Sequence, residues 1–246
     1  NRGIGLELAS QLAAAGWTVS GVCRQRTPAL SEVAHAVWDG IDVTDDGLEA
    51  ALANAAGATP IDLLINCAGI VHVAPLHEYS EQEWDLLMGV NFKSIFFTIK
   101  HGISHLRQNQ RSYMVNIGSI GSFIGQGLTP TYIASKHAVL GLSRNIALDY
   151  AVDGLRCNCI CPGITDTPML RFHLSTTPDP EATLANRLRR VPMGVAITPM
   201  DIARAVLYFS CEDSAGITGT SLVIDGGYLT AAEWETSGPT KFQEPL

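Results

Sequence analysis

Apolar and polar positions alternate along the chain with two periods, one typical of helices and one typical of strands. Residues 6–15 have apolar positions at helical spacing and end at Gly16, a residue that often follows a helix, whereas residues 17–23 have the pattern of a strand. Strands are predicted at 17–23, 37–43, 61–65, 112–117, 155–161 and 221–224, and helices at 6–15, 45–56, 92–108, 131–151 and 199–211, with a further helix starting at Ser80. This order predicts a single α/β domain over 1–246, in which helices cover a doubly wound parallel sheet.

Polar residues mark several helix starts. Thr44 is predicted to cap the helix at 45–56, Ser80 and Glu83 have capping-box spacing, and Thr198 is followed by a proline at the first helical position. The polar stretch 233–246 has no periodicity and is predicted to be irregular.

Composition narrows the classes of function. The chain has 246 residues, 46% of them hydrophobic and 16% charged, which fits one domain with a large buried sheet. A net charge of −8 argues against binding to nucleic acid or an anionic membrane. No apolar stretch is long enough to span a membrane and no signal peptide is visible, so we expect a cytoplasmic protein.

The six cysteines indicate reduced thiols and no metal site. Cys157, Cys159 and Cys161 alternate along one predicted strand and therefore share a face of it. Their spacing differs from the Cys-x-x-Cys pairs of zinc sites, so buried thiols are the better interpretation.

Tyr132 and Lys136 carry the strongest chemical signal. They are four residues apart on a predicted helix, so they project from one face, and Ser119 precedes Tyr132 by thirteen residues. A cation beside a phenol favours the phenolate form, which suits proton exchange with a carbonyl or alcohol oxygen. This pattern alone also occurs on ordinary helix surfaces.

Further motifs accompany that pair along nearly the whole chain. Gly3-Ile4-Gly5 opens the first helix, Asn66-Cys67-Ala68-Gly69 follows one apolar run, Asn91 lies in Gly-Val-Asn-Phe, and Pro162-Gly163 follows another run. In this order and at these spacings the chain resembles the short-chain dehydrogenase/reductase family. The resemblance implies a Rossmann-type fold and an NAD(P)-dependent oxidoreductase that transfers a hydride between the nicotinamide and a carbonyl or secondary alcohol.

The resemblance also implies roles for individual residues. Tyr132 would be the acid in reduction and the base in oxidation, Lys136 would assist it and bind the nicotinamide ribose, Ser119 would hold the substrate oxygen, and Asn91 would hold a water linked to Lys136. Cofactor contacts are expected from Arg2, Gly3, Ile4, Gly5, Arg24, Asp42, Val43, Asn66, Ala68, Gly69, Tyr132, Lys136, Pro162, Gly163, Ile164 and Thr167. None of these catalytic or cofactor-binding roles requires a metal ion.

The end of the second strand bears on the choice between NADP(H) and NAD(H). NAD-specific relatives usually have an acidic residue there, whereas this chain has Cys23 followed by Arg24. A guanidinium can bind a 2′-phosphate through charge-assisted bonds, and Arg2 adds a second cation. NADP(H) is therefore favoured, with NAD(H) left open.

The segment 168–198 is the predicted substrate lid, because it follows the nicotinamide contact and carries apolar residues such as Met169 and Leu174. Its arginines Arg187, Arg189 and Arg190 are interpreted as a solvated helix face rather than as an anion site. Sugars, polyols, hydroxysteroids and 3-oxoacyl groups all stay open as substrates, as does the direction of the reaction. The family resemblance implies a homotetramer or homodimer built on the helices 92–108 and 131–151, with Ile95, Phe96 and Leu142 either in that interface or in the core.

Two further expectations concern the whole protein. The chain begins inside the glycine motif, so we expect about ten or more further residues before Asn1 that supply the first strand of the sheet. The alternative function is a non-catalytic module that binds the dinucleotide for regulation or scaffolding. The intact set of Asn91, Ser119, Tyr132 and Lys136 argues against that alternative.

Overall fold

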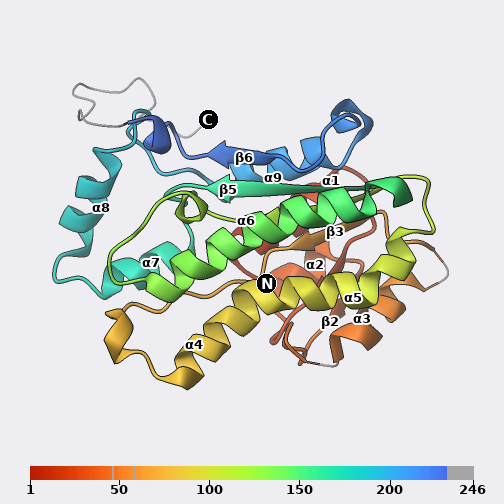
Figure 1. Cartoon of the computed structure of the whole chain (residues 1–246), viewed down its shortest axis with the longest axis horizontal. Helices are drawn as coiled ribbons and strands as arrows, with labels where there is room; N and C mark the ends of the chain where they lie inside the picture. The colour runs from red at the N-terminus through yellow and green to blue at the C-terminus, as the bar shows by residue number, and fades with distance from the viewer. Residues whose placement is uncertain (46, 58, 232–246) are drawn as a thin grey trace.

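The computed structural model describes residues 1–45, 47–57 and 59–231, so the polar stretch 233–246 lies outside the described residues. Parallel strands are covered by helices on both faces, as predicted (Figure 1). The strands are β1 (Ser20–Val22), β2 (Ala36–Trp38), β3 (Leu63–Asn66), β4 (Ser112–Ile117), β5 (Leu155–Pro162) and β6 (Ser221–Ile224). The helices are α1 (Gly3–Ala14), α2 (Pro28–Val33), α3 (Gly47–Ala56), α4 (Glu81–Met88), α5 (Ser94–Leu106), α6 (Pro130–Tyr150), α7 (Pro168–Ser175), α8 (Pro180–Leu188) and α9 (Pro199–Phe209).

The two faces of the central strands pack into separate cores. Met114 of β4 and the cysteines of β5 face α3, α5 and α6, where Ile99 and Val139 meet them. Val115 of β4 and Ile160 of β5 face α1 and α9 on the other side. Both strands are buried almost throughout, which explains their near-continuous apolar sequences.

The described strands form two sheets, β1–β2 and β3–β4–β5–β6, and all pairings within them are parallel. In β4 and β5, six residue pairs run in register from Ser112 opposite Leu155 to Ile117 opposite Ile160. Between β1 and β3 lies a cavity rather than a strand pairing. The expectation of a strand before Asn1 stays a prediction.

Several element boundaries differ from the sequence prediction. The first two strands are shorter than predicted, with β1 at Ser20–Val22 and β2 at Ala36–Trp38. Helix α2 was not predicted. Its short span of Pro28–Val33 has Thr27 as the N-cap and a proline at the start, a pattern too brief to show periodicity. The segment 168–198, for which no helix was predicted, contains the helices α7 and α8.

Two of the three predicted helix starts are confirmed. Ser80 and Glu83 form a complete capping box at α4, and Thr198 with Asp201 forms another at α9. Thr44 behaves differently, since its hydroxyl and its backbone N–H both donate to Asp42 Oδ1, at 2.8 and 3.1 Å.

The predicted helix at 92–108 is continuous with α4 through a π-helical turn at Gly89–Lys93. Such a turn contains one residue more than an α-helical turn, and it often occurs at functional sites. Here the extra residue places Asn91 inward, where its side chain is 2% exposed.

The apolar residues named for an interface divide between core and surface. Ile95 is buried and Leu142 packs against the same core, whereas Phe96 is 51% exposed on α5. Among the helices of the described residues, none combines the length and apolarity that a membrane crossing requires.

Two glycines on and after α6 should respond oppositely to alanine. Gly154, which leads into β5, has φ +78°, and a Cβ there would lie 2.2 Å from the carbonyl oxygen of Gln110. Gly141 is exposed within α6, and a Cβ there would meet open space. We expect Gly154→Ala to lower the free energy of unfolding by more than about 1 kcal/mol. Gly141→Ala should raise it by about 0.5–1 kcal/mol. Urea denaturation measures both, and equal effects of the two changes would contradict the strain assigned to Gly154.

Candidate active site

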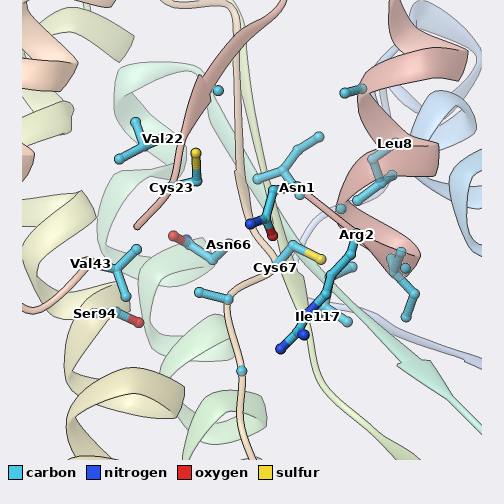
Figure 2. A pocket seen from close by; sticks show the side chains of 18 of the residues that line it. Asn1, Arg2, Leu8, Val22, Cys23, Val43, Asn66, Cys67, Ser94 and Ile117 are labelled. Atoms are coloured by element: carbon cyan, nitrogen blue, oxygen red, sulfur yellow. The ribbon is translucent and has the colours of Figure 1, made fainter. Parts of the chain in front are cut away.

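A cavity of about 1640 Å³ opens at the carboxyl ends of the strands and extends between β1 and β3. Figure 2 shows Val22, Cys23 and Val43 on one side of it and Arg2 and Leu8 on the other. Every residue predicted above to bind the cofactor or to take part in catalysis lines this cavity. The fold thus brings together side chains from positions 2 to 167.

Tyr132 and Lys136 lie on the first turns of α6, which starts at Pro130. The Lys136 ammonium lies 5.7 Å from the centre of the Tyr132 ring. Lys136 is only 6% exposed, and its Nζ donates to the carbonyl oxygen of Ile117 at 2.8 Å. This bond joins α6 to the end of β4 and is the only Lys136 Nζ hydrogen bond among the described residues, so two ammonium hydrogens can serve other acceptors.

Ser119 follows β4 and lies on the same side of the cavity as Tyr132. Its Oγ accepts the Gly121 N–H at 3.0 Å, which fixes the turn after the strand. A Cβ at Gly121 would lie 3.3 Å from Ser119 Oγ and 3.6 Å from Tyr132 Cε1, so both side chains adjoin this glycine. Ser122 ties the same turn to α6, because its hydroxyl donates to the Lys136 carbonyl at 2.7 Å.

Asn91 makes three hydrogen bonds. Its Oδ1 accepts the Ile70 N–H at 2.8 Å, and its Nδ2 donates to the Ile70 carbonyl at 2.9 Å and to Ser135 Oγ at 3.1 Å. Both amide hydrogens are therefore used, and one Oδ1 lone pair is left to receive a water. The loop after β3 is held against the π-helical turn and α6 by this one side chain.

The glycine motif meets the segment after β5. Gly3 has φ +52°, and a Cβ there would lie 3.4 Å from Pro168 Cδ and 3.5 Å from Thr167 Cγ2. Thr167 caps α7 by accepting the Leu170 N–H at 3.3 Å. Among the described residues, the start of α1 has no side-chain cap and no acidic residue in its first turn, and its residues Gly3, Ile4 and Gly5 line the cavity.

The loop after β3 closes on the catalytic side chains. A Cβ at Gly69 would lie 3.6 Å from Asn91 Oδ1, 3.8 Å from Lys136 Nζ and 4.0 Å from Met169 Cε. Asn66 points back to the sheet, where its Nδ2 donates to Asn116 Oδ1 at 2.7 Å. Ala68 lies between them along the chain and also lines the cavity.

The residues after β5 are placed by tight packing. A Cβ at Gly163 would lie 2.7 Å from both Cα and Cβ of Asp225, so only glycine fits beside that backbone. Pro162 and Ile164 flank it and line the cavity on either side.

At the far end of the cavity, Arg24 and Asp42 face each other, with Arg24 Nε 3.9 Å from Asp42 Oδ2. The Arg24 side chain is 65% exposed and the Asp42 side chain is 22% exposed. Cys23 is buried and Val43 adjoins Asp42, and both contribute to the lining. Arg24 is thus available to a ligand, although a carboxylate already stands near it.

Sequence reasoning missed several parts of the site. Ser135, Ser122 and the Ile117 carbonyl all anchor the predicted catalytic residues. Ser135 follows Tyr132 by one helical turn, so the helical spacing already contained a signal for it. Cys67 lines the cavity, and burial raises the pKa of its thiol to about 11, so it is protonated at neutral pH.

The cysteines of β5 are buried thiols, with Cys159 Sγ 3.7 Å from Cys161 Sγ. Within the part of the chain that the structure describes, no three His, Cys, Asp or Glu side chains gather as they would around a metal ion.

Comparisons with known proteins show the family to which the chain belongs. The family model described as enoyl-(acyl carrier protein) reductase matches residues 1–229. The dehydrogenase/reductase SDR family member 6 of Xenopus laevis is 38% identical over 169 residues, which are 68% of this chain and 69% of that protein.

Solved structures are similar over almost the whole chain. The aldohexose dehydrogenase of Thermoplasma acidophilum is 30% identical with a TM-score of 0.89, and the match covers 96% of this chain and 94% of the other. A variant actinorhodin polyketide ketoreductase solved with NADPH is 28% identical with a TM-score of 0.86, over 92% and 93% of the two chains. The matched family model, the identity to named relatives and the shared fold lead to one conclusion: this chain belongs to the short-chain dehydrogenase/reductase family.

Proposed function

We propose that the protein interconverts a carbonyl and a secondary alcohol by hydride transfer, with Tyr132 as the general acid and base. The observation that carries this proposal is the meeting of Tyr132, Ser119 and the Lys136 ammonium at one wall of the cavity. A phenol beside a buried cation and a second hydroxyl is suited to exchanging a proton with a substrate oxygen.

The cavity residues fit a nicotinamide dinucleotide. The N–H groups at the start of α1 face the cavity without a side-chain cap, and such groups bind phosphate. Lys136 is a buried cation with two unused hydrogens, which suit the hydroxyls of a ribose. The bound cofactor supplies or accepts the hydride at its nicotinamide ring.

Residues of the chain itself then donate and accept the proton. In reduction, Tyr132 donates its phenolic proton to the substrate oxygen, and in oxidation the phenolate removes the proton from the alcohol. The Ile117 carbonyl holds the Lys136 ammonium in place beside the Tyr132 ring. Ser119 donates a second hydrogen bond to the substrate oxygen and thereby orients it.

Asn91 is a positioning residue, which holds the loop after β3 beside Lys136. Its bonds to both backbone groups of Ile70 fix the loop that carries Gly69, next to Lys136. Its remaining Oδ1 lone pair receives a water in the proposed path between Lys136 and solvent.

We also propose that NADP(H) is preferred. Arg24 is largely exposed at the adenosine end of the cavity, and Arg2 lines the same cavity. A 2′-phosphate would pair with these cations in competition with Asp42, whose Oδ2 lies 3.9 Å from Arg24 Nε and whose Oδ1 accepts from Thr44. NAD(H) lacks that phosphate and would gain less from Arg24.

The segment 168–198 is proposed as the substrate lid, since Met169 of α7 reaches to within 4.0 Å of a Cβ built at Gly69. A homodimer or homotetramer through α5 and α6 is part of the same proposal. The exposed apolar side chains Phe96, Leu148 and Val152 support it, with 51%, 77% and 93% of their surfaces accessible.

Tyr132→Phe should lower turnover at least about a hundredfold, because it removes the proton donor and leaves the ring in place. The dissociation constant for NADPH should stay within about twofold of wild type. Tyr208→Phe removes a partly exposed hydroxyl on α9 and is the matched control, with turnover unchanged. Steady-state rates and NADPH fluorescence measure the two properties, and a Tyr132→Phe protein with wild-type turnover would falsify the mechanism.

Arg24→Asp should shift the cofactor preference toward NADH. The wild type is expected to bind NADPH at least about tenfold more tightly than NADH, and the variant should lose most of that ratio, since a carboxylate repels the 2′-phosphate. Arg189→Asp makes the same charge change on the exposed end of α8 and should leave the ratio unaltered. Titrations following nicotinamide fluorescence give both constants. If Arg24→Asp keeps the wild-type ratio, the assignment of Arg24 is wrong.

A further inference from the structure

Two basic side chains of the segment 168–198 lie in the cavity and not on the outer surface. His173 of α7 and Arg187 of α8 are both half-buried and both line the cavity. Arg187 Nη2 lies 3.2 Å from His173 Nε2. Since a guanidinium has only donors, His173 accepts this hydrogen bond through Nε2 and carries its own proton on Nδ1. The interpretation of Arg187 as part of a solvated helix face is therefore wrong for this one arginine.

The neighbouring arginines serve as a comparison. Arg189 is exposed and bonds Asn186, and Arg190 is exposed with its guanidinium 5.0 Å from the centre of the Tyr228 ring. Neither lines the cavity. Arg171 of α7 is exposed as well and pairs with Asp166 at 3.2 Å. Only Arg187 of these four combines partial burial with a position in the cavity wall.

Arg187 lacks an anionic partner within the described residues. None of the ion pairs formed there includes it, and its contact is the neutral ring of His173. Burial lowers the pKa of the guanidinium, and burial together with the Arg187 charge lowers the pKa of His173. A cation removed from water without a counter-charge is costly, and that cost is offset when an anion binds.

The pair stands close to the proposed reaction centre. His173 follows Met169 by four residues on α7, so the two side chains share a face of that helix and are about 5–6 Å apart at Cβ. The end of the Met169 side chain is 4.0 Å from a Cβ built at Gly69, and that Cβ is 3.8 Å from Lys136 Nζ. Met169 thus connects the helix that carries His173 to the loop of Gly69, next to Lys136.

We propose that Arg187, held in place by His173, binds a carboxylate of the substrate. The substrates are accordingly short oxo acids or hydroxy acids, with the carboxylate a few carbon atoms from the carbon that exchanges the hydride. This inference rests on the proposed function, because it assigns the substrate class of the same cavity.

The test compares acids with their uncharged esters in the full chain. Rates of NADPH oxidation are measured for 2-oxobutanoate, 3-oxobutanoate and 4-oxopentanoate and for the methyl ester of each. Wild type should show a kcat/KM at least about tenfold higher for one acid than for its ester, the size expected for a charge-assisted hydrogen bond. Arg187→Met should remove that preference by lowering kcat/KM for the acid while leaving the ester unchanged. Arg187→Lys should restore part of it, and Arg189→Met should behave as wild type.

Two results overturn the inference while the proposed function stands. One is turnover of esters at least as fast as of acids in every pair, and the other is an equal loss for acid and ester in Arg187→Met. A third check separates substrate from cofactor: the NADPH dissociation constant of Arg187→Met should equal that of wild type. A value weakened tenfold would mean that Arg187 binds a cofactor phosphate instead, which also overturns the inference.

Absence of turnover with all six compounds would count against the proposed function, and the inference is then decided by binding alone. Calorimetric titration of the protein with NADP⁺ present, using the same three acids, should show binding that Arg187→Met weakens at least about tenfold. If none of the acids binds, or if Arg187→Met binds them as wild type does, the carboxylate site does not exist.

Discussion

The parallel pairing of β4 with β5, buried on both faces, is the constraint on which the rest of the structure depends. Six residue pairs run in register, and almost no side chain of either strand reaches water. Parallel strands end at the same edge of a sheet, so whatever follows β3, β4 and β5 must meet there. Ser119 follows β4, Gly163 follows β5, and Gly69 follows β3. The cavity exists because three chain segments leave one buried edge together.

The electrostatics of that edge depend on cations that are held by neutral groups. Lys136 is anchored by a backbone carbonyl and Arg187 by a neutral imidazole, and neither forms an ion pair within the described residues. A neutral acceptor fixes the position of a cation without neutralising its charge. Both positive charges therefore remain available to an anionic group of a cofactor or a substrate in the cavity.

The sequence allowed the chemistry to be predicted better than the supports around it. Tyr132, Lys136 and Ser119 stand at fixed spacings and gather in the cavity as expected. Ser122 and the Ile117 carbonyl could not be assigned, because a hydrogen bond between distant segments leaves no periodic trace in a single sequence.

The helices and strands also differ in how well the sequence predicts them. The long central elements were predicted nearly to their ends, since buried strands and amphipathic helices impose strong patterns. Helices α7 and α8 span only 168–175 and 180–188, and both present several polar side chains, so their periodicity is weak. Arg187 was misplaced for the same reason: nothing in the sequence says on which side of a short polar helix the cavity lies.

The π-helical turn at Gly89–Lys93 limits which changes of sequence the fold can accept. An α-helix advances by about 100° per residue, so one extra residue sets the faces of α4 and α5 out of phase by that angle. Loss of a single residue between 89 and 93 would restore a regular helix and rotate Asn91 away from Ile70. A substitution in this turn changes one side chain and leaves the helix register as it is. A one-residue deletion would instead alter three features together: the loop after β3, the surroundings of Lys136 and the burial of α5. This segment must therefore preserve its length as well as Asn91.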